Sequence, residues 1–538
     1  NMTIYKPSEE IVVVKTNESG IATLTACEAG WYFIVEENRN GWCNTTWWNA
    51  WYVYVTSGHV EYFETSTLPY DVIPGMAWFP NFRCVNITVF KYEDVDSNRR
   101  YDPEIDHPLP GWNISLYDIS HGILYNNTTD EDGLVSFTLC KAGYYLLTEE
   151  LKDGWCQLVP SEGYYYLWVE SGLVIDLDSQ MPTYYYEFAN FECVKITIFK
   201  YWDKCSNGWY DPGEPIFDEP LSGWKFWLID EDGYWYYLGE TNASGLLEVT
   251  ICKAGSYTIV EEDREGWSHI KPASGRIDIS VVSGDAYTLW FGNYKHVMIP
   301  IFKYEDVDSD GVYDEGYDRP IEGWNFTMHR IGDPPSAYYY GSTDENGMLI
   351  FIVNRSGTYI IDEEERTGWT HIEPASGIRP ISVTSNITVP VQEFGNFKDV
   401  TIEIFKFEDV DSDGVYDEGY DRPIEGWNMT IFGPGLPNGQ ASIVIQTNST
   451  GIASVTVNRS GWYYIYEEMR SGWCNTTWWT ARTVCVTSGH VEYGWENAVD
   501  PETGELYNPD IHIAWFANFR CVDIVMFKFE DVDSDGFY

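Results

Sequence analysis

The sequence predicts an all-β protein, a tandem array of antiparallel β-sandwich repeats. Three observations predict this fold class. A Phe-Lys pair recurs at residues 90, 199, 302, 405 and 527, at intervals of roughly 100 to 120 residues, the size of one small sandwich. Short alternating apolar runs lie between turn signals rich in Gly, Asn and Asp. No amphipathic helical stretch of useful length separates them.

The recurring pattern sets the domain boundaries, because 538 residues are too many for one core. Each complete repeat has a first strand, an acidic loop, a strand after Gly-Trp and a Thr-x-x-x-Gly hairpin. A Gly-x-Tyr-x-x-x-Glu-Glu strand, a second Gly-Trp and a closing strand near Asn-Phe follow. The expected domains are repeat 1 at 1–82, which lacks the first strand and loop, and repeats 2 to 5 at 83–191, 192–294, 295–397 and 398–519. Residues 520–538 follow as a first strand and partial loop.

The two partial repeats fit each other. Residues 1–4 match 428–431, which follow Gly-Trp in the fifth repeat, and residues 520–538 resemble the part that 1–82 lacks. Either the sequence is one unit of a longer repeating polypeptide, or separate subunits complete each other's domains by strand addition. The first is favoured, because a natural chain end inside an acidic loop would be unusual.

The repeats follow one another without a spacer. The stretch 396–398 passes from a last strand to a first strand with no Pro, Gly or Ser linker. The junctions are therefore expected to be stiff, and the array is expected to form a rod.

The acidic loops have the ligand spacing of a calcium site. Calcium takes six to eight oxygen ligands, which a loop supplies from carboxylates at alternate positions, a backbone carbonyl and later acids. The flanks are strands, so the loops are not EF-hands. The expected ligands are Asp94, Asp96, Asn98, Asp102, Asp106; Asp203, Asn207, Asp211, Glu214; Asp306, Asp308, Asp310, Val312, Asp314, Asp318; Asp409, Asp411, Asp413, Val415, Asp417, Asp421; and Asp531, Asp533, Asp535.

Two loops depart from the pattern. Arg99 replaces the turn glycine, and Cys205 replaces a carboxylate, so repeats 2 and 3 are expected to bind calcium more weakly. The alternative for all copies is a solvated acidic turn without metal.

The formal net charge of −52 makes nucleic acids and anionic membranes poor partners and cations good ones. Such acidity is also typical of proteins from halophiles, or can serve solubility alone. No apolar run approaches the ~20 residues that span a bilayer, and no signal segment opens the sequence, so any export signal or anchor is expected outside it.

The eleven cysteines contain no Cys-x-x-Cys motif. Cysteine in Gly-Trp-Cys and in Asn-Phe-x-Cys occurs in the same repeats, which predicts disulfides Cys43–Cys84, Cys156–Cys193 and Cys474–Cys521 and an oxidising, extracellular setting. Cys27, Cys140, Cys205, Cys252 and Cys485 stay unassigned.

Acceptor sites for N-glycosylation are in excess. About fifteen Asn-x-Ser/Thr sites occur, where this composition gives roughly four by chance. They are Asn1, Asn17, Asn44, Asn86, Asn113, Asn126, Asn127, Asn242, Asn325, Asn354, Asn386, Asn428, Asn448, Asn458 and Asn475. A glycosylated surface protein is expected.

The motifs together resemble a known family. The signature Phe-Lys-x-Glu-Asp-x-Asp-x-Asp-Gly, the hairpin at 343–347, Gly-x-Tyr-x-x-x-Glu and Phe-Gly-Asn-Phe resemble the calcium-binding B repeats of Sdr-type adhesins and the related Cna-type B domains. The resemblance covers essentially the whole chain. It implies immunoglobulin-like or prealbumin-like sandwiches that serve as stalks and fibre subunits.

The resemblance to Cna-type domains also implies a covalent bond. There a first-strand Lys and a last-strand Asn form an isopeptide bond assisted by a Glu or Asp. The matching residues here are Lys91, Glu149, Asn190; Lys200, Glu261, Asn293; Lys303, Glu363, Asn396; and Lys406, Glu467, Asn518. By the same alignment Lys528 meets the counterparts of Glu36 and Asn81 in a following unit. A Lys–Glu ion pair or simple exposure is the alternative.

No pattern indicates catalysis. Glu-Glu pairs recur in every repeat, which favours a scaffold role over glycosidase acids. Histidines lack ligand spacing, and no nucleophile motif recurs. Aromatic residues make up 17% of the sequence and cluster at 47–48, 164–166, 184–186, 338–340 and 478–479, where they would pack on glycans or neighbours, or bind a ligand.

We therefore expect a non-enzymatic, glycosylated, calcium-stabilised extracellular filament or surface stalk, built by end-to-end association or as one continuous chain. The alternative is an adhesin that binds carbohydrate or a partner protein through exposed aromatics.

Overall fold

The computed structural model describes residues 1–46, 49–63, 75–213, 217–477, 480–493, 513–532 and 536–537. The chain forms two compact units. The first comprises residues 1–201, 220–262 and 272–291, and the second comprises 202–219, 263–271 and 292–538. The division falls inside repeat 3.

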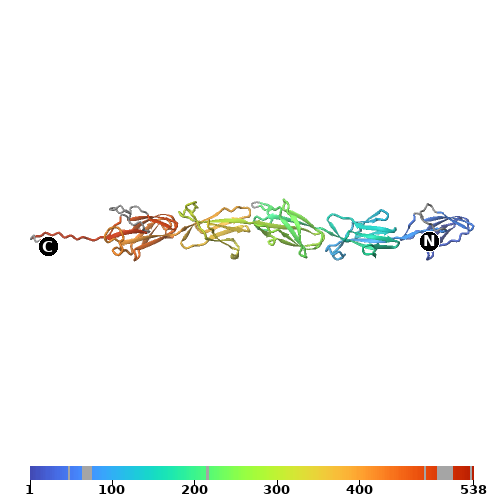
Figure 1. Cartoon of the computed structure of the whole chain (residues 1–538), viewed down its shortest axis with the longest axis horizontal. Helices are drawn as coiled ribbons and strands as arrows, with labels where there is room; N and C mark the ends of the chain where they lie inside the picture. Colours follow the sequence, from blue (N-terminus) through green and yellow to red (C-terminus); the bar gives the residue numbers. More distant parts are fainter. Residues whose placement is uncertain are drawn as a thin grey trace. The chain divides into compact units, whose positions relative to one another are not determined.

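The all-β prediction is confirmed. Strands make up every repeat (Figure 1), and the helices in the described residues are two short 3-10 turns, η1 (Pro335–Ala337) and η2 (Pro437–Gly439).

Repeat 2 shows the plan of a complete sandwich. Its first sheet has the order β12-β8-β18-β14 with β9 beside β8, and its second has the order β11-β10-β13-β15-β16-β17. Inward-facing residues of both sheets form one apolar core around the buried Trp112. The strands are β8 (Val85–Glu93), β9 (His107–Pro108), β10 (Asn113–Asp118), β11 (Ile123–Thr128), β12 (Leu134–Leu139), β13 (Gly143–Glu149), β14 (Trp155–Val159), β15 (Tyr164–Glu170), β16 (Leu173–Asp176), β17 (Met181–Pro182) and β18 (Tyr185–Glu192).

Repeat 4 has the same two sheets, in the orders β29-β28-β36-β34 with β32 beside β28, and β31-β30-β33-β35. Its core surrounds the buried Trp324. The strands are β28 (Val297–Glu305), β29 (Arg319–Pro320), β30 (Asn325–Arg330), β31 (Tyr339–Ser342), β32 (Met348–Val353), β33 (Gly357–Glu363), β34 (Trp369–Glu373), β35 (Ile378–Val383) and β36 (Gln392–Lys398).

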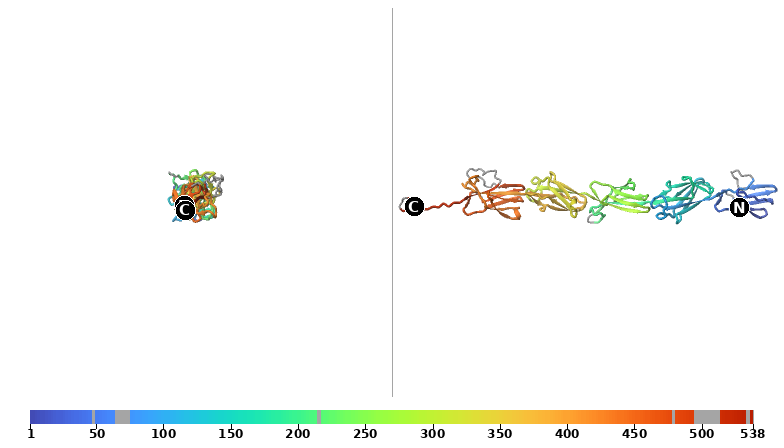
Figure 2. Two further views of the ribbon diagram at one scale, coloured as in Figure 1. Left: turned by 90° about the vertical axis from the view of Figure 1, so that its left-hand side faces the viewer. Right: turned by 90° about the horizontal axis from the view of Figure 1, so that it is seen from below.

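Repeat 5 follows with sheets β38-β37-β46-β43, with β41 beside β37, and β40-β39-β42-β44-β45, around Trp427. Its strands are β37 (Val400–Glu408), β38 (Arg422–Pro423), β39 (Asn428–Phe432), β40 (Ser442–Gln446), β41 (Ile452–Val457), β42 (Gly461–Glu467), β43 (Trp473–Asn475), β44 (Ala481–Thr487), β45 (His490–Tyr493) and β46 (Ala514–Arg520). After β46 the chain continues as an extended segment (Figures 1 and 2).

Repeat 3 contributes to both units. In the first, β19 pairs with β23, and the sheet β22-β21-β24-β26 is complete. In the second, β25 pairs with residues 292–295 of β27. The strands are β19 (Val194–Trp202), β20 (Glu219–Pro220), β21 (Lys225–Ile229), β22 (Trp235–Glu240), β23 (Leu246–Ile251), β24 (Gly255–Glu261), β25 (Trp267–Lys271), β26 (Arg276–Val281) and β27 (Ala286–Lys295).

Repeat 1 is the exception. One sheet is full, in the order β2-β1-β3-β5-β6, but in the described residues the other holds only β4 and β7. The strands are β1 (Met2–Tyr5), β2 (Ile11–Val14), β3 (Gly30–Glu36), β4 (Trp42–Asn44), β5 (Ala50–Thr56), β6 (His59–Phe63) and β7 (Asn81–Arg83).

The first and last strands of a repeat lie side by side and run parallel, a detail that the prediction of purely antiparallel sheets missed. Strand β8 pairs with β18, β28 with β36, and β37 with β46. Only one residue separates the last strand of one repeat from the first strand of the next, as between β36 and β37. The expected absence of a linker is thus confirmed.

A threonine fixes the start of the second sheet against the first in each complete repeat. In repeat 4 the buried Thr343 hydroxyl accepts a hydrogen bond from the Trp324 N–H at 3.0 Å and donates to the Ile321 carbonyl at 2.6 Å. Thr129, Thr241 and Thr447 make the same pair of bonds. Because a buried backbone group without a partner destabilises the fold, this explains the Thr-x-x-x-Gly signature.

Candidate metal sites

The acidic loop of repeat 4 is organised by two carboxylates. Asp306 is buried and accepts the backbone N–H groups of Asp310 and Gly311, at 3.2 and 2.9 Å. Asp318 closes the loop by accepting the N–H groups of Val307 and Asp314, at 2.8 and 2.9 Å. The loop conformation therefore depends on carboxylates at its beginning and end.

The carboxylates also cluster as cation ligands would. One oxygen each of Asp306, Asp308 and Asp310 lies within 4.8 Å of the others, and the same holds for sets in repeats 2 and 5, namely Asp94, Asp96 and Asp106, and Asp409, Asp411 and Asp421. Oxygen-only donor sets suit a hard cation such as calcium. These residues fit the cation that the sequence predicts.

Burial raises the pKa of the first carboxyl of the loop. The pKa of Asp306 rises to about 6, against the lowering effect of the Gly311 N–H, and the nearby Asp318 and Asp308 raise it further. The pKa of Asp94 also rises to about 6, chiefly through burial. A bound cation would remove this electrostatic cost of ionisation.

Repeat 3 has a loop carboxylate that the predicted ligand set left out, whereas the predicted ligand Glu214 lies outside the described residues and stays a prediction. The buried Asp218 accepts the N–H groups of Lys204 and Asp211, both at 2.9 Å, and so takes the place that Asp318 has in repeat 4. The sequence analysis overlooked Asp218, because it counted a fixed loop length. The shared Asp-x-Pro ending of the loops would have identified Asp218.

Other predicted ligands have varied positions. Asn98 donates its side-chain amide to Asp96 at 2.9 Å, and Asn207 donates to Asp211 at 2.7 Å. Val312 and Val415 donate backbone N–H groups to Asp310 and Asp413, and a role for their carbonyls stays a prediction. Glu214, Asp533 and Asp535, and the aromatic pairs at 47–48 and 478–479, lie outside the described residues.

Arg99 has the left-handed backbone that its glycine counterparts have. Its φ is 65°, beside 79° for Gly208, 86° for Gly311 and 83° for Gly414. A side chain is strained in this region, which supports the expectation of a weaker loop in repeat 2.

The loops of repeats 2, 3 and 4 contact the following repeat through a serine. The Ser97 hydroxyl accepts the Ala254 N–H at 2.9 Å, and the Ser309 hydroxyl accepts the Ser460 N–H at 2.9 Å. Ser206 accepts the Ser356 N–H in the same way. All three acceptors have positive φ, which follows from the tight turn of the loop.

A backbone carbonyl of the loop makes a second contact. Val307 accepts the N–H of Ser488 at 3.0 Å, and the Ser488 hydroxyl in turn accepts the Lys398 N–H at 2.7 Å. The matching bonds join Val95 to Ser283 and Lys204 to Ser385. The acidic loop is therefore part of the interface between consecutive repeats.

The predicted lysine and glutamate pairs are buried inside the sandwiches. The Nζ to Oε2 distances are 2.9 Å for Lys91 and Glu149, 2.7 Å for Lys200 and Glu261, 2.9 Å for Lys303 and Glu363, and 3.1 Å for Lys406 and Glu467, and all eight side chains have zero exposure. The second glutamate of a pair faces outward. Glu364, for example, pairs with Arg366 and accepts a hydrogen bond from the Asn325 side chain.

Burial weakens the charged forms of these pairs. It lowers the pKa of Lys91, Lys303 and Lys406 to about 8, against the opposing effect of the glutamates. It also raises the pKa of Glu363, against the lowering effects of Lys303 and of the Asn396 amide. The site therefore favours a neutral lysine more than solvent does.

The asparagine links the buried pair to the acidic loop. The Asn396 carbonyl accepts the N–H of Asp306 at 2.9 Å, and Asn190 and Asn518 do the same for Asp94 and Asp409. Asn293, the matching residue of repeat 3, accepts the N–H of Asp203 at 2.8 Å.

Two of the three predicted disulfides are wrong. Cys84 is bonded to Cys140 and not to Cys43, and Cys193 is bonded to Cys252 and not to Cys156. The reason is strand register, because Leu139 pairs with Val85 and so places Cys140 beside Cys84.

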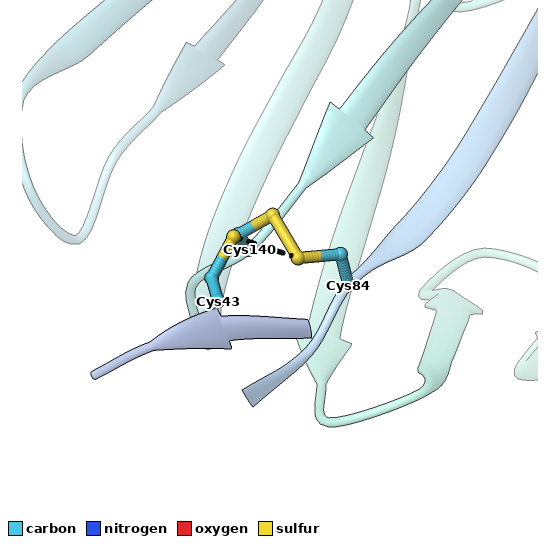
Figure 3. Close-up of side chains that lie close together, drawn as sticks. All are labelled: Cys43, Cys84 and Cys140. Atoms are coloured by element: carbon cyan, nitrogen blue, oxygen red, sulfur yellow. Dashed lines mark hydrogen bonds between the residues drawn. A yellow bond between two sulfur atoms is a disulfide. The ribbon is translucent and has the colours of Figure 1, made fainter. Parts of the chain in front are cut away.

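Cys43 and Cys156, which these two disulfides leave unbonded, lie close to them. Figure 3 shows Cys43 against the Cys84–Cys140 bond, with its Sγ 2.9 Å from that of Cys84. Cys156 lies 3.2 Å from Cys193. The third pair, Cys474–Cys521, forms as predicted. Cys27, Cys205 and Cys485 are free thiols.

The predicted glycosylation sites and part of the aromatic clusters reach solvent. None of the fifteen acceptor asparagines is buried. Tyr186 is buried, whereas Tyr184 and Tyr340 are exposed. The sequence analysis missed the most exposed aromatic run, Tyr234 to Tyr237 around the start of β22, where all four side chains are at least half exposed.

The sequence was compared with family models and with known proteins. No family model matches the chain. It is 23% identical over 424 residues to serine-aspartate repeat-containing protein F of Staphylococcus epidermidis, covering 72% of this chain and 24% of that protein. It is 24% identical over 314 residues to serine-aspartate repeat-containing protein D of Staphylococcus aureus, covering 54% and 23%.

The chain is similar to Sdr proteins. This confirms the resemblance predicted from the repeat motifs, and the chain spans about a quarter of the length of these relatives. Among solved structures, the Bacillus anthracis TIE protein has 16% identity and a TM-score of 0.23 over 80% of this chain and 74% of its own. BcpA, the major pilin subunit of Bacillus cereus, has 13% identity and a TM-score of 0.25 over 59% and 99%.

In the part of the chain that the structure describes, no helix is long and apolar enough to cross a membrane.

The raised pKa of Asp306 predicts the sign of a pH dependence. In metal-free protein the native state binds more protons than the unfolded chain between the unfolded pKa of about 4 and the folded pKa of about 6. Stability should therefore fall as pH rises through this window. Calorimetry of the metal-free chain at pH 4.5 and 7 should show a smaller fall for Asp306→Asn than for wild type.

Asp362→Asn is the matched control, because it removes the same charge from the exposed face of β33. Equal pH dependence in wild type and Asp306→Asn would contradict the prediction.

Proposed function

We propose that the chain is a structural subunit of an extracellular filament or cell-surface stalk, glycosylated and stabilised by calcium. The observation that carries this proposal is the recurring contact between an acidic loop and the next repeat. Subunits join end to end, or the repeats continue in one longer chain.

Calcium would act on the junction through the loop. A cation between the carboxylates of Asp306, Asp308 and Asp310 offsets their mutual repulsion and keeps the loop folded. The folded loop presents the Ser309 hydroxyl and the Val307 carbonyl to repeat 5. Metal binding in one repeat thereby holds the next repeat in place.

Repetition of the same sites supports a structural role over catalysis. In repeats 2 to 5 the first carboxylate of each Glu-Glu pair lies on a buried lysine, and in repeat 4 the second lies on Asn325 at the surface, so the two do not face each other across a cleft as glycosidase acids do. The solvent-accessible acceptor asparagines support glycosylation, which suits an extracellular location.

Removal of calcium tests the proposal. Chelation should lower the melting temperature of the chain and expose the junctions to protease, because a ligand that binds only the folded state stabilises it. The affinity should be modest, with a dissociation constant of roughly 10⁻⁴–10⁻³ M. Calorimetry and limited proteolysis, with and without chelator, measure both effects.

Asp306→Asn should reduce the effect of chelator on melting temperature and on protease resistance of the junction after repeat 4, and Asp362→Asn should leave both effects unchanged. Identical melting and identical protease resistance in calcium and in chelator would reject the role of calcium.

We also propose that the buried trios form isopeptide bonds. The neutral Nζ of Lys303 attacks Cγ of Asn396, the new C–N bond replaces the Cγ–Nδ2 bond, and ammonia leaves. Glu363 takes the proton from the lysine and returns it to the departing nitrogen. The zero exposure of the pair and the lowered pKa of Lys303, to about 8, support this step.

Intact mass decides the question. The reduced and deglycosylated chain should be lighter than its sequence by one ammonia for each bond, and four trios are available. Glu363→Ala should restore one ammonia and leave the other three bonds formed. A mass equal to that of the plain sequence would exclude the bonds and leave ion pairs in the core.

Adhesion through aromatics is the second candidate. The exposed run Tyr234 to Tyr237 offers ring faces to a sugar or a partner protein. Glycan binding by the deglycosylated chain, lost in Trp235→Ala, would favour this candidate.

A further inference from the structure

The outer face of the second sheet of repeat 5 carries a row of exposed aromatic rings. Side chains of β42 alternate between the core and the solvent, and Trp462, Tyr464 and Tyr466 face the solvent with 55, 45 and 43% of their surface exposed. Phe432 of the neighbouring β39 is also exposed, and its ring centroid lies 5.7 Å from that of Tyr466. An apolar patch of this kind marks an interaction site.

Three of these rings surround a hollow in the sheet surface. Phe432, Tyr464 and Tyr466 line a depression of about 510 Å³. In the pairing of β39 with β42, Phe432 lies opposite Tyr464, and Thr430 lies opposite Tyr466. The hollow therefore follows the direction of the two strands, and its walls are ring faces and edges without formal charge.

An acceptor site for N-glycosylation lies at the end of the same row. Asn428 begins β39, and because the next residue, Met429, is fully buried, the Asn428 side chain points to the outer face. The Glu468 N–H donates to the Asn428 carbonyl at 2.9 Å, so Tyr466 is the diagonal neighbour of Asn428 across the strand pair. Diagonal neighbours lie about 7–8 Å apart, within reach of a sugar attached to the asparagine.

The orientation of the Asn428 amide favours the direction toward the rings. Strand β39 lies between β40 and β42. The Oδ1 atom of Asn428 accepts a hydrogen bond from the Gln446 side chain of β40 at 2.8 Å. Because the oxygen and nitrogen of an amide point in different directions, Nδ2, the atom that carries an N-glycan, is directed to the β42 side.

Repeat 2 has the same combination of acceptor and rings. Asn113 begins β10, and the exposed Tyr117 of this strand lies on the same outer face. Tyr144 of β13 and Trp168 of β15 continue the face, with ring centroids 4.7 Å apart. A second acceptor, Asn126 of β11, lies on this face as well.

Repeat 4 has the acceptor without the row of rings. Asn325 begins β30 at the position that Asn428 has in β39. At the positions of the three rings of β42, strand β33 instead has Asp362, Ile360 and Thr358. The two repeats therefore provide a matched comparison within one chain.

We propose that the N-glycan of Asn428 lies along β39 and β42 and stacks on the rings of Tyr466 and Tyr464. The C–H face of a pyranose ring is apolar and packs on an aromatic ring, while its hydroxyl groups stay in water. Because this glycan is tethered beside the hollow, it competes with free sugars and proteins at a high effective concentration. The stacked glycan covers the aromatic face and withdraws it from lateral contacts with neighbouring copies.

The inference rests on the glycosylation in the proposed function and names the surface that one glycan binds. Oxidative footprinting of the whole glycosylated chain, read by mass spectrometry, tests it ring by ring. Asn428→Gln should label Tyr464 and Tyr466 roughly twofold faster than wild type, since a stacked sugar covers one of the two faces of an exposed ring. Thr430→Val removes the hydroxyl of the acceptor motif at nearly constant shape and should have the same effect.

Asn325→Gln is the matched control. It removes the glycan from the equivalent position of repeat 4 and should leave the labelling of Tyr464 and Tyr466 unchanged. An unmodified Asn428 peptide in wild type, or equal labelling of both rings in wild type and Asn428→Gln, would overturn the inference.

Protection of the rings that persists in Asn428→Gln and grows with protein concentration would also overturn it, because a second copy would then cover the face. Calcium-dependent melting of a chain that carries sugar at its acceptors but labels equally with and without the Asn428 glycan would leave the proposed function standing. The two failures are therefore distinguishable.

Discussion

The structure depends on a buried carboxylate at the end of the first strand. Asp306 of repeat 4 accepts two backbone N–H groups of the loop, and its own N–H is held by the Asn396 carbonyl of the last strand. One residue therefore connects the sandwich, the acidic loop and, through the loop, the next repeat. The carboxyl is desolvated there, so its ionised form needs a compensating charge.

The parallel pairing of first and last strands has a second consequence. It brings the lysine of one strand near the asparagine of the other, inside a core where the glutamate is the counterion. The same asparagine carries the carbonyl that holds the loop. Mechanical load between repeats would pass along these two strands, because one residue separates the end of β36 from the start of β37.

Much of this arrangement could be predicted from the sequence. The repeat period, the strand alternation and the acidic spacing identified the fold and the loops, because these features depend on local pattern repeated several times. The lysines and their partners were expected from the resemblance to Cna-type domains. The similarity to Sdr proteins agrees with the motifs from which it was expected.

The remainder depends on register and on contacts across repeats. Cys140 pairs with Cys84 because β12 aligns with β8, which no spacing rule reveals. Asp218 was missed because the loop of repeat 3 differs in length before its conserved geometry resumes. The serine contacts were missed because their partners lie about 150 residues apart in the sequence.

We propose that the acidic loop, when it binds calcium, orders the following repeat. Hydrogen exchange at the backbone amides of Ser460 and Ser488, which donate to the loop of repeat 4, tests it most directly. With saturating calcium these two amides of repeat 5 should exchange more slowly than in chelator, by a factor that Asp306→Asn reduces. Slower exchange confined to residues 306–318, with no change at Ser460 and Ser488, would contradict the account.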